Sequence, residues 1–425
     1  MKKVRLPYSK EFIELEVDDD VAILESKAHD FKPDKSQEEL VREALENPID
    51  SKRLCELAKG KKRITIITSD HTRPVPSRVT LPIYLEEIRK GAPDAEITIL
   101  IATGFHRPTT KEEMIQKFGE EIVKNEKIVN HISSNDEDMI ELEKLPSGGR
   151  LLLNKHAIDT DLLVSEGFIE PHFFAGFSGG RKSILPGVAS QKTVFANHCS
   201  KFIASEHART GKLKENPIHK DMEFAAKAAK LAFILNVVID ADKKVIGAFA
   251  GDCVTAHAKG CDFVRELSTI NGVNADIAVT TNGGYPLDQN VYQSVKSMTA
   301  AEAAVADDGV IIEVSRCNDG HGGESFYRTF KEAASPKEIE DRILQIPMEE
   351  TIADQWEIQI LARILVRHKV IFVTDKENKK LIEEMHMEYA STVEEALERA
   401  KEIKGKNAKV AFVPDGVSVI VNKMK

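Results

Sequence analysis

A glycine-rich stretch in the middle of the chain carries residues that could bind anions and do covalent chemistry. It reads GFIEPHFFAGFSGGRKSILPGVASQKTVFANH and ends at His198. Residues 176–183, GFSGGRKS, nearly match a phosphate-binding P-loop, but Arg181 stands where a slim glycine should precede Lys182. The stretch therefore predicts affinity for phosphate and argues against nucleoside triphosphate hydrolysis. Its interspersed phenylalanines argue against a flexible connector, because aromatic side chains pack.

Two histidines, His172 and His198, flank Lys182 in this stretch. Imidazole is the commonest side-chain ligand for late first-row metals. Neither histidine belongs to an HExxH pair or a facial triad, so one of them could hold a metal only if another group supplied the remaining ligands. A plain helix-terminal or core role for His198 stays open on the residues alone.

A second loop, SDHTRPVPS at residues 69–77, combines acceptors, hydroxyls and a cation. Asp70 and Thr72 offer oxygen atoms, and the guanidinium of Arg73 is a planar fork suited to a carboxylate or phosphate. A helix is expected to start directly after it, which would add free N–H groups for an anion. The alternative is an ordinary capped turn with Arg73 in solvent.

A third loop, TGFHRPTT, places His106 two residues after Gly104, where the backbone can turn sharply. A histidine at the end of a strand can act as a general acid or base near neutral pH. A surface histidine without a catalytic role remains the alternative.

The elements that must position these loops alternate between short apolar runs and helical patterns. Near-continuous apolar strands predict parallel sheets buried on both faces, so the expected fold class is α/β, with two domains that each have a mainly parallel sheet flanked by helices. The expected strands are residues 63–68, 96–103, 161–165, 276–281, 309–315, 369–374 and 409–413. Helices are expected at 77–90, 110–118 and 216–230. In such sheets ligands sit beyond the carboxyl ends of the strands, where all three loops fall.

A polar stretch, STINGVNAD, suggests a domain boundary near residues 267–275. We expect residues 1–267 to form a first α/β domain with the cofactor and catalytic loops. Residues 274–405 would form a second that contributes to the substrate pocket. The apolar segment within residues 406–425 is expected to return to the first domain.

Composition narrows the class of protein. The chain has 425 residues with 42% hydrophobic and 30% charged residues, which is ordinary for a globular protein. A net charge of −10 argues against a nucleic-acid partner. Five cysteines without a CxxC pair suggest reduced thiols, and neither a signal peptide nor a long apolar run is recognisable. We therefore expect a cytoplasmic protein without a membrane partner.

Together, these loops resemble the signature stretches of the nickel-dependent lactate racemase family. SDHTRPVPS, TGFHRP, GFIEPHFFAGFSGGRKSILPGVAS and the pair Asn197-His198 match, as does YQSVK at residues 292–296. Trp356 falls where the family has an active-site tryptophan. The resemblance covers essentially the whole chain.

The resemblance implies a nickel-pincer nucleotide, pyridinium-3-thioamide-5-thiocarboxylic acid mononucleotide, attached covalently to the side-chain nitrogen of Lys182. Two sulfurs and one carbon of that cofactor would hold Ni(II), and His198 would be the single protein ligand. Asp70, His71, Thr72 and Arg73 match the loop that approaches the nucleotide. Cofactor-biosynthesis proteins are implied as partners, and without them the chain would lack the cofactor.

The implied reaction is the interconversion of D- and L-lactate by hydride transfer, with a small 2-hydroxy acid as substrate. His106 and His172 match the family's pair of opposed bases. Substrate-binding roles fall to Arg73, Tyr292, Gln293, Lys296 and Trp356. A racemase or epimerase of another 2-hydroxy acid and a non-catalytic nucleotide-binding protein remain alternatives, whereas a nicotinamide-dependent dehydrogenase is disfavoured because no GxGxxG follows the early strands.

Overall fold

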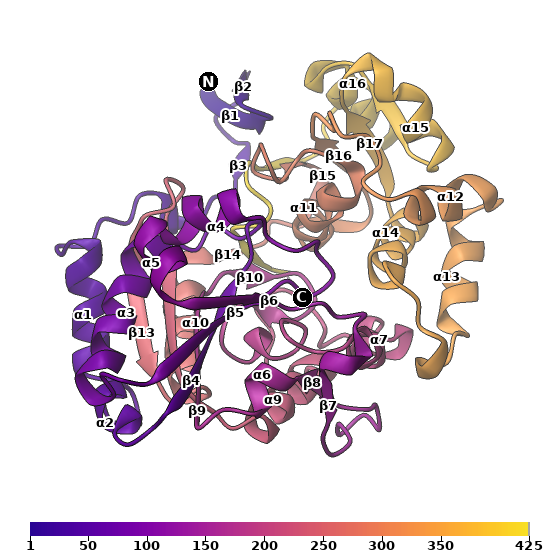
Figure 1. Cartoon of the computed structure of the whole chain (residues 1–425). Coiled ribbons are helices and arrows are strands. Elements are labelled where there is room, and N and C mark those ends of the chain that lie inside the picture. Colours follow the sequence, from indigo (N-terminus) through magenta and orange to yellow (C-terminus); the bar gives the residue numbers. More distant parts are fainter. Residues whose placement is uncertain (424–425) are drawn as a thin grey trace.

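The computed structural model describes residues 1–423 as two lobes, each built on a six-stranded sheet with helices on both faces (Figure 1). In Figure 1 the first lobe is mainly indigo to salmon and the second mainly orange to yellow, apart from the indigo strands at the N-terminus, which lie beside the second lobe. The expected class, α/β with two mainly parallel sheets, is confirmed. No helix within the described residues is both long and apolar enough to cross a membrane.

The first sheet has the strand order β13-β12-β9-β4-β5-β6 and is parallel except at one edge, where β13 runs antiparallel to β12. Its strands are β4 (Arg63–Ser69), β5 (Glu96–Ala102), β6 (Lys127–Asn130), β9 (Leu162–Phe168), β12 (Leu231–Ile239) and β13 (Val245–Gly251). The sequence predicted β4, β5 and β9 within a few residues but missed the other three strands.

Both faces of the first sheet are covered, which explains its near-continuous apolar strands. One face carries α1 (Gln37–Glu46), α2 (Leu54–Ala58) and α3 (Ser77–Gly91). The other carries α6 (Lys155–Ile158), α9 (Pro217–Ala228) and α10 (Thr255–Ser268). As expected, Asn216 caps α9, and Thr110 begins α4 (Lys111–Phe118) with a capping box.

The second sheet is parallel throughout, with the order β18-β17-β16-β15-β19-β3. Its strands are β3 (Ala22–Ile23), β15 (Ala275–Thr281), β16 (Val305–Val314), β17 (Lys369–Val373), β18 (Glu388–Ala390) and β19 (Val410–Val413). Helices α11 (Val291–Ala304) and α14 (Gln355–Arg367) cover one face, and α16 (Val393–Lys404) covers the other.

The N-terminal residues depart from the expected domain assignment of 1–267. Strand β3 pairs with β19, and the hairpin of β1 (Lys2–Tyr8) and β2 (Glu11–Val17) buries apolar side chains against the second sheet. Figure 1 shows this indigo hairpin beside the second lobe. The correction is that residues 2–23 complete the second domain. Sequence periodicity missed this because strand pairing between distant segments leaves no local signal.

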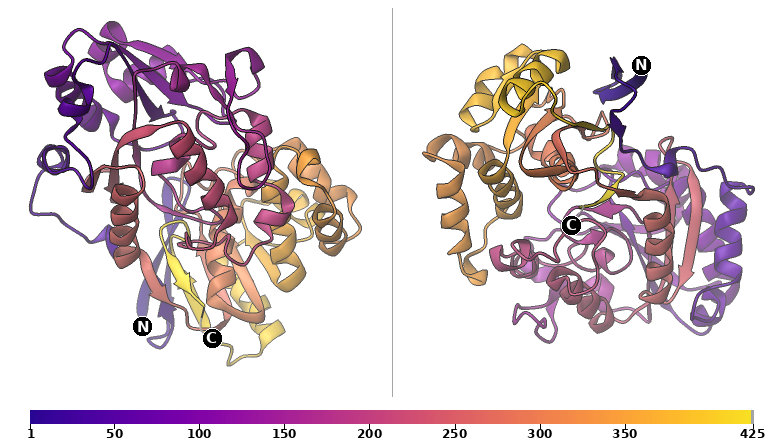
Figure 2. Two further views of the ribbon diagram at one scale, coloured as in Figure 1. Left: turned by 90° about the horizontal axis from the view of Figure 1, so that it is seen from below. Right: turned by 180° about the vertical axis from the view of Figure 1, so that it is seen from behind.

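The C-terminal segment also differs from its expected return to the first domain. Strand β19 lies inside the second sheet, while β20 (Ile420–Asn422) pairs with β14 (Thr269–Asn271). Ile420 joins a cluster of first-domain side chains that includes Phe177, and Val413 and Val419 join a cluster with side chains from both domains. Figure 2 shows this yellow segment running between the lobes. The final two residues lie outside the described part of the chain.

The remaining elements are short or peripheral. They are α5 (Glu120–Asn125), β7 (Met139–Glu141), β8 (Leu152–Asn154), β10 (Pro171–His172), β11 (Gly176–Phe177), α7 (Gln191–Asn197), α8 (Ser200–Ile203), α12 (Glu324–Glu332), α13 (Pro336–Leu344) and α15 (Lys379–Glu384).

Candidate active site

The three loops singled out in the sequence leave the carboxyl ends of adjacent strands. Strand β4 lies between β9 and β5 in the sheet, and all three are parallel. Asp70 lies in the loop after β4, His106 in the loop after β5, and His172 in the stretch after β9. The sheet therefore brings residues about 100 positions apart to one edge, where ligands of open α/β sheets bind.

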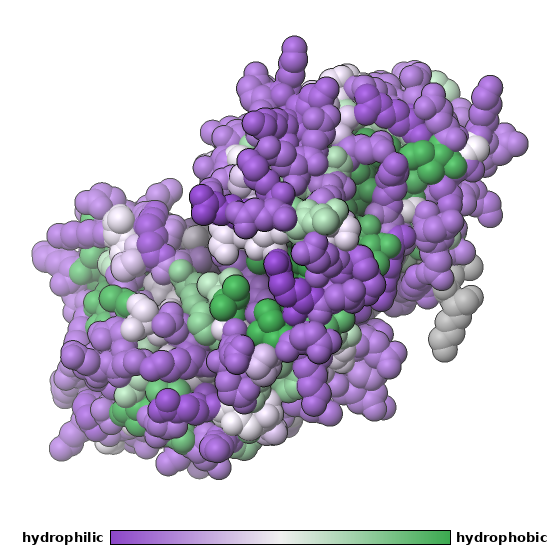
Figure 3. Space-filling view, turned by 90° about the vertical axis from the view of Figure 1, so that its right-hand side faces the viewer, coloured by the Kyte–Doolittle hydropathy of each residue, from purple (hydrophilic) through white to green (hydrophobic). Residues whose placement is uncertain are grey.

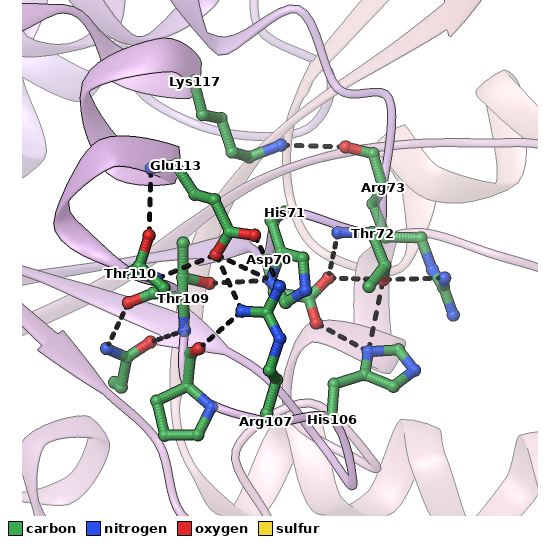
Figure 4. Close-up of polar contacts among 12 residues, drawn as sticks. Asp70, His71, Thr72, Arg73, His106, Arg107, Thr109, Thr110, Glu113 and Lys117 are labelled. Carbon is green, nitrogen blue, oxygen red and sulfur yellow. Dashed lines mark hydrogen bonds and ion pairs between the residues drawn. The ribbon is translucent and has the colours of Figure 1, made fainter. Parts of the chain in front are cut away.

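Asp70 and His106 form a direct pair between two of these loops. His106 Nδ1 donates to Asp70 Oδ2 at 2.6 Å (Figure 4). Asp70 Oδ1 accepts from the hydroxyl and the backbone N–H of Thr72 at 2.7 and 3.1 Å. Asp70 is 1% exposed, whereas His106 is 40% exposed on its side chain. The carboxylate thus fixes the orientation of an imidazole that faces solvent.

Burial by itself raises the pKa of Asp70, but the hydrogen bond and charge of His106, the Thr72 hydroxyl and the charge of Arg73 together lower that pKa to about 2. The carboxyl group is therefore ionised at any physiological pH. The resemblance implied that Asp70 approaches the nucleotide; its observed contacts are to His106 and Thr72.

His71 and Arg73 leave the same loop in different directions. His71 Nδ1 lies 3.2 Å from Thr109 Oγ1 and 3.8 Å from Glu113 Oε2, toward α4. Arg73 is exposed, and its guanidinium donates to the Thr72 hydroxyl at 3.0 Å. Figure 4 shows these residues around Asp70. Among the described residues, no carboxylate forms an ion pair with the guanidinium of Arg73.

The glycine-rich stretch forms a compact loop around Lys182. Strands β10 and β11 pair as a small hairpin, and residues 180–183 form a 3-10 turn that carries Lys182. Lys182 Nζ lies 3.1 Å from His172 Nε2 and 5.7 Å from the centre of the Phe174 ring. The stretch is not a strand–loop–helix P-loop, as the misplaced Arg181 suggested.

Arg181, which sequence analysis treated only as a defect, holds this loop together. Its guanidinium is 2% exposed and donates to the carbonyl oxygens of Ala175 and Phe177, both at 2.8 Å. It also donates to His219 Nδ1 at 3.0 Å and lies 3.1 Å from His257 Nε2. These contacts fix the backbone from which Lys182 projects.

His198 ends α7 and lies between aromatic rings of both domains. Its ring centre is 5.1 Å from that of Phe174 and 5.0 Å from that of Trp356. Its Nδ1 atom is buried without a hydrogen-bond partner. Burial, followed by the charge of Lys182, lowers the pKa of His198 to about 3, so the ring is neutral and can serve as a ligand.

The second domain contributes residues from α11 and the start of α14. Asn290 caps α11 by accepting from the backbone of Gln293, and Lys296 donates to Gln293 Oε1 at 2.5 Å. The hydroxyl of Tyr292 donates to Oδ1 of Asp354 at 3.0 Å, and Asp354 is the residue directly before α14. Trp356 lies in the first turn of α14.

Charges from both domains act on Lys182. Burial lowers the pKa of its amine well below the usual value, and the charges of Arg181, Arg73 and Lys296 lower it further. Burial is also the largest cause of the lowered pKa of His172, followed by the charges of Lys182, Lys296 and Arg73. Burial and the surrounding cations therefore disfavour the charged form of both groups in the absence of a ligand.

Two acidic residues near this cleft were given no role from the sequence. Glu357 follows Trp356 in the chain and is 1% exposed. Burial raises the pKa of its carboxyl group, although the positive charge of Lys296 acts to lower it. Burial likewise raises the pKa of Glu170, despite the lowering effect of Arg73 and Lys296. The only sequence signal was adjacency: Glu170 lies two residues before His172.

Among residues 1–423, no three His, Cys, Asp or Glu side chains come together as a metal site. A metal at His198 would therefore need ligands from a bound group. The residues around Lys182 also include two cations that could bind an anionic ligand, Arg73 and Lys296, and the sheet edge presents two imidazoles that could transfer protons, His106 and His172.

Comparison with known proteins identifies the family. Residues 8–211 match the lactate racemase N-terminal domain, and residues 270–421 match the lactate racemase C-terminal domain. The chain is 57% identical over 425 residues to a lactate racemase of Thermoanaerobacterium thermosaccharolyticum, covering 100% of both chains. It is 56% identical over 423 residues to one of Lactiplantibacillus plantarum, covering 99% of this chain and 100% of that protein.

Comparison with solved structures supports the same family. The lactate racemase apoprotein of T. thermosaccharolyticum superposes with a TM-score of 0.96 at 57% identity, covering 99% of this chain and 100% of that one. A Thermotoga maritima protein has a TM-score of 0.65 at 19% identity, covering 91% and 97%, and shows the shared fold alone. This chain belongs to the lactate racemase family and is an isomerase of the racemase type.

Proposed function

We propose that this chain interconverts D- and L-lactate at the cleft around Lys182. The observation that carries the proposal is the contact of Lys182 with His172 beside the buried His198, with the His106–Asp70 pair on the neighbouring loops of the same sheet edge, in a chain that is 57% identical over its whole length to a lactate racemase. Its five cysteines are free, which suits action in the reducing cytoplasm.

Inversion at C2 of a 2-hydroxy acid needs a proton acceptor on each side of the substrate. We assign the two roles to His106 and His172. In each direction one histidine would accept the hydroxyl proton of the starting enantiomer, and the opposed histidine, in its protonated form, would donate a proton to the oxygen of the product; the two exchange roles in the reverse reaction. Asp70 holds the His106 ring in place and stabilises its protonated form, while burial keeps His172 neutral and ready to accept a proton.

Arg73 and Lys296 would bind the substrate carboxylate from opposite domains. Their charges depress the pKa values of Lys182 and His172, so a bound anion relieves an excess of positive charge. Gln293, which accepts from Lys296, would orient that ammonium group and hydrogen-bond the substrate. Tyr292 and Trp356 would exclude water.

We further propose a nickel-pincer nucleotide attached to Lys182, with His198 as the protein's ligand to Ni(II). The residues fit this group: burial and nearby cations lower the pKa of the Lys182 amine and so favour its neutral, nucleophilic form, His198 is a neutral imidazole with a ring nitrogen that has no partner, and no protein-only metal cluster occurs among residues 1–423. When bound, the cofactor would supply a hydride acceptor, so that a planar 2-keto acid could be reduced on either face. The proteins that synthesise the cofactor would be required partners.

Chiral analysis tests the activity. Protein co-produced with the cofactor-making enzymes should convert pure L-lactate to a mixture of enantiomers, and His106→Ala and His172→Ala should each abolish conversion while the fold is retained. Racemisation of malate or another 2-hydroxy acid, but not of lactate, by nickel-loaded protein would contradict the lactate assignment.

Intact mass tests the attachment. The co-produced chain should carry an added mass of the nucleotide that is absent from Lys182→Ala and present in a matched variant of an exposed lysine, Lys380→Ala. An unmodified chain from cofactor-replete cells would favour a non-catalytic nucleotide-binding protein.

A further inference from the structure

Phe105 is a large, partly exposed apolar side chain at the contact between the two domains. It lies between Gly104 and the proposed base His106 and is 39% exposed. Its ring stacks on Phe195 with centres 5.4 Å apart, and it meets Trp356 of the second domain at 5.9 Å. The contact with Trp356 makes one aromatic wall from the two domains.

This wall differs in chemistry from the rest of the cleft. Arg73, Lys296 and Gln293 offer charges and hydrogen bonds, which suit the carboxylate and hydroxyl of a 2-hydroxy acid. The remaining group of such a substrate is the substituent on C2, which is apolar in lactate. The aromatic wall beside His106 and His198 is the surface suited to receive it.

We propose that Phe105 is a specificity-determining residue, which together with Trp356 limits the size of the substituent on C2. The inference rests on the proposed function. Trp356 is 9% exposed and packs on His198, so it is a fixed part of the wall. Phe105 is the more exposed part of the wall, so a smaller side chain at this position would remove bulk from the wall without exposing the buried core.

The test compares Phe105→Ala and Phe105→Leu with the wild type, each loaded with cofactor. The substrates are lactate, 2-hydroxybutyrate and 2-hydroxy-4-methylpentanoate. Because one methylene in an apolar pocket changes kcat/KM by about 10–200-fold, we expect the ratio of kcat/KM for the larger acids to that for lactate to rise at least about tenfold in Phe105→Ala. Phe105→Leu should give a smaller rise.

Phe12→Ala is the matched control. Phe12 is also an exposed phenylalanine, 53% exposed, but lies on β2 against Arg5. This variant should keep the wild-type ratio. An unchanged ratio in Phe105→Ala overturns the inference about Phe105, whereas wild-type protein that racemises no 2-hydroxy acid overturns the proposed function instead.

A second measurement needs no cofactor. Trp356 is the only tryptophan of the chain, so its fluorescence reports directly on this wall. Loss of the Phe105 ring should expose the indole and shift its emission to longer wavelength, while Phe12→Ala should leave the emission unchanged. Identical emission in Phe105→Ala and the wild type overturns the contact on which the inference stands.

Discussion

The Asp70 carboxylate and the His106 imidazole illustrate how single residues acquire function here. The two side chains come from different loops and meet at 2.6 Å, with the acid buried and the base exposed. Burial alone would raise the pKa of Asp70, but the hydrogen bonds and charges of its neighbours outweigh burial and lower that pKa to about 2. The pair therefore keeps a fixed negative charge behind an exposed imidazole, as the proposed role of His106 as a base requires.

We predict that Asp70→Asn lowers kcat about 100-fold, because His106 loses the group that orients it and stabilises its protonated form, while KM changes little. Steady-state kinetics with lactate would measure this. Asp262→Asn, at an exposed carboxylate paired with Arg265, should keep wild-type kinetics. A rise in KM with an unchanged kcat would contradict an orienting role for Asp70.

The same substitution has a pH signature in stability. The folded pKa of Asp70, about 2, lies below the unfolded value of about 3.9, so its ionised form stabilises the fold by about 2.6 kcal/mol at neutral pH, and this contribution is lost progressively as the pH falls from about 5 toward about 1. The stability difference between wild type and Asp70→Asn, measured by urea unfolding, should therefore shrink over that interval.

Lys296 gives a prediction at alkaline pH. Burial and then the charge of Arg73 lower its pKa below that of an ordinary lysine, although Glu357 and Glu170 oppose the shift. As the pH rises, Lys296 should therefore lose its positive charge before the pH reaches the usual lysine pKa of about 10.4, and the KM for lactate should rise with that loss. Lys296→Arg keeps the charge at all these pH values, so its KM should stay flat between pH 7 and 10.

At the scale of elements, the glycine-rich loop is shaped by one buried guanidinium. Arg181 binds carbonyl oxygens of residues 175 and 177, and Gly180 donates to Asn236 Oδ1 at 2.7 Å. Gly180 has a φ of 51°, and a Cβ there would lie 2.7 Å from the His257 ring. The loop that presents Lys182 is thus specified by contacts with β12 and α10.

We predict that Arg181→Met lowers the free energy of unfolding by about 3 kcal/mol, because several buried carbonyl groups lose their donor. Urea denaturation would measure the loss. The same variant should carry less of the added mass at Lys182 when co-produced with the cofactor-making enzymes. Arg328→Met, at an exposed arginine on α12, should change stability by less than about 0.5 kcal/mol. Wild-type stability and loading in Arg181→Met would contradict the prediction.

At the scale of the whole molecule, the chain crosses between lobes at both ends. The N-terminal hairpin covers the second sheet through Val4, Leu6 and Leu15, and Tyr8 hydrogen-bonds Asp375 at 2.8 Å. Gln359 of α14 donates to the backbone of Ser200 in α8 at 2.9 Å, which joins the lobes beside the cleft. Figure 3 shows hydrophobic surface where the two lobes meet.

We predict that deleting residues 2–17 destabilises the second lobe by about 4 kcal/mol, because three buried apolar side chains leave its sheet. Hydrogen exchange followed by mass spectrometry should show faster exchange in β15, β16 and β17, with protection of β4 and β5 retained. Phe12→Ala, on the exposed side of the hairpin, is the control and should not change exchange. Equal loss of protection in both lobes would place the hairpin in a different role.

The sequence by itself determined the α/β class, several central strands and the three loops at their carboxyl ends. Apolar runs of buried parallel strands and the turn residues after them are local signals, so residues near 63–69, 96–102 and 162–168 could be located without coordinates. The unusual glycine-rich stretch also carried the resemblance to the family, which the comparisons then established.

Only the tertiary structure decided which of these residues touch. It paired Asp70 with His106, set Lys182 against His172, brought Trp356 between His198 and Phe105, and turned Arg181 from a motif defect into the centre of a hydrogen-bond network. It also moved residues 2–23 to the second domain. The physical reason is that strand pairing and side-chain burial across two domains depend on contacts between residues far apart in the chain, which local periodicity does not encode.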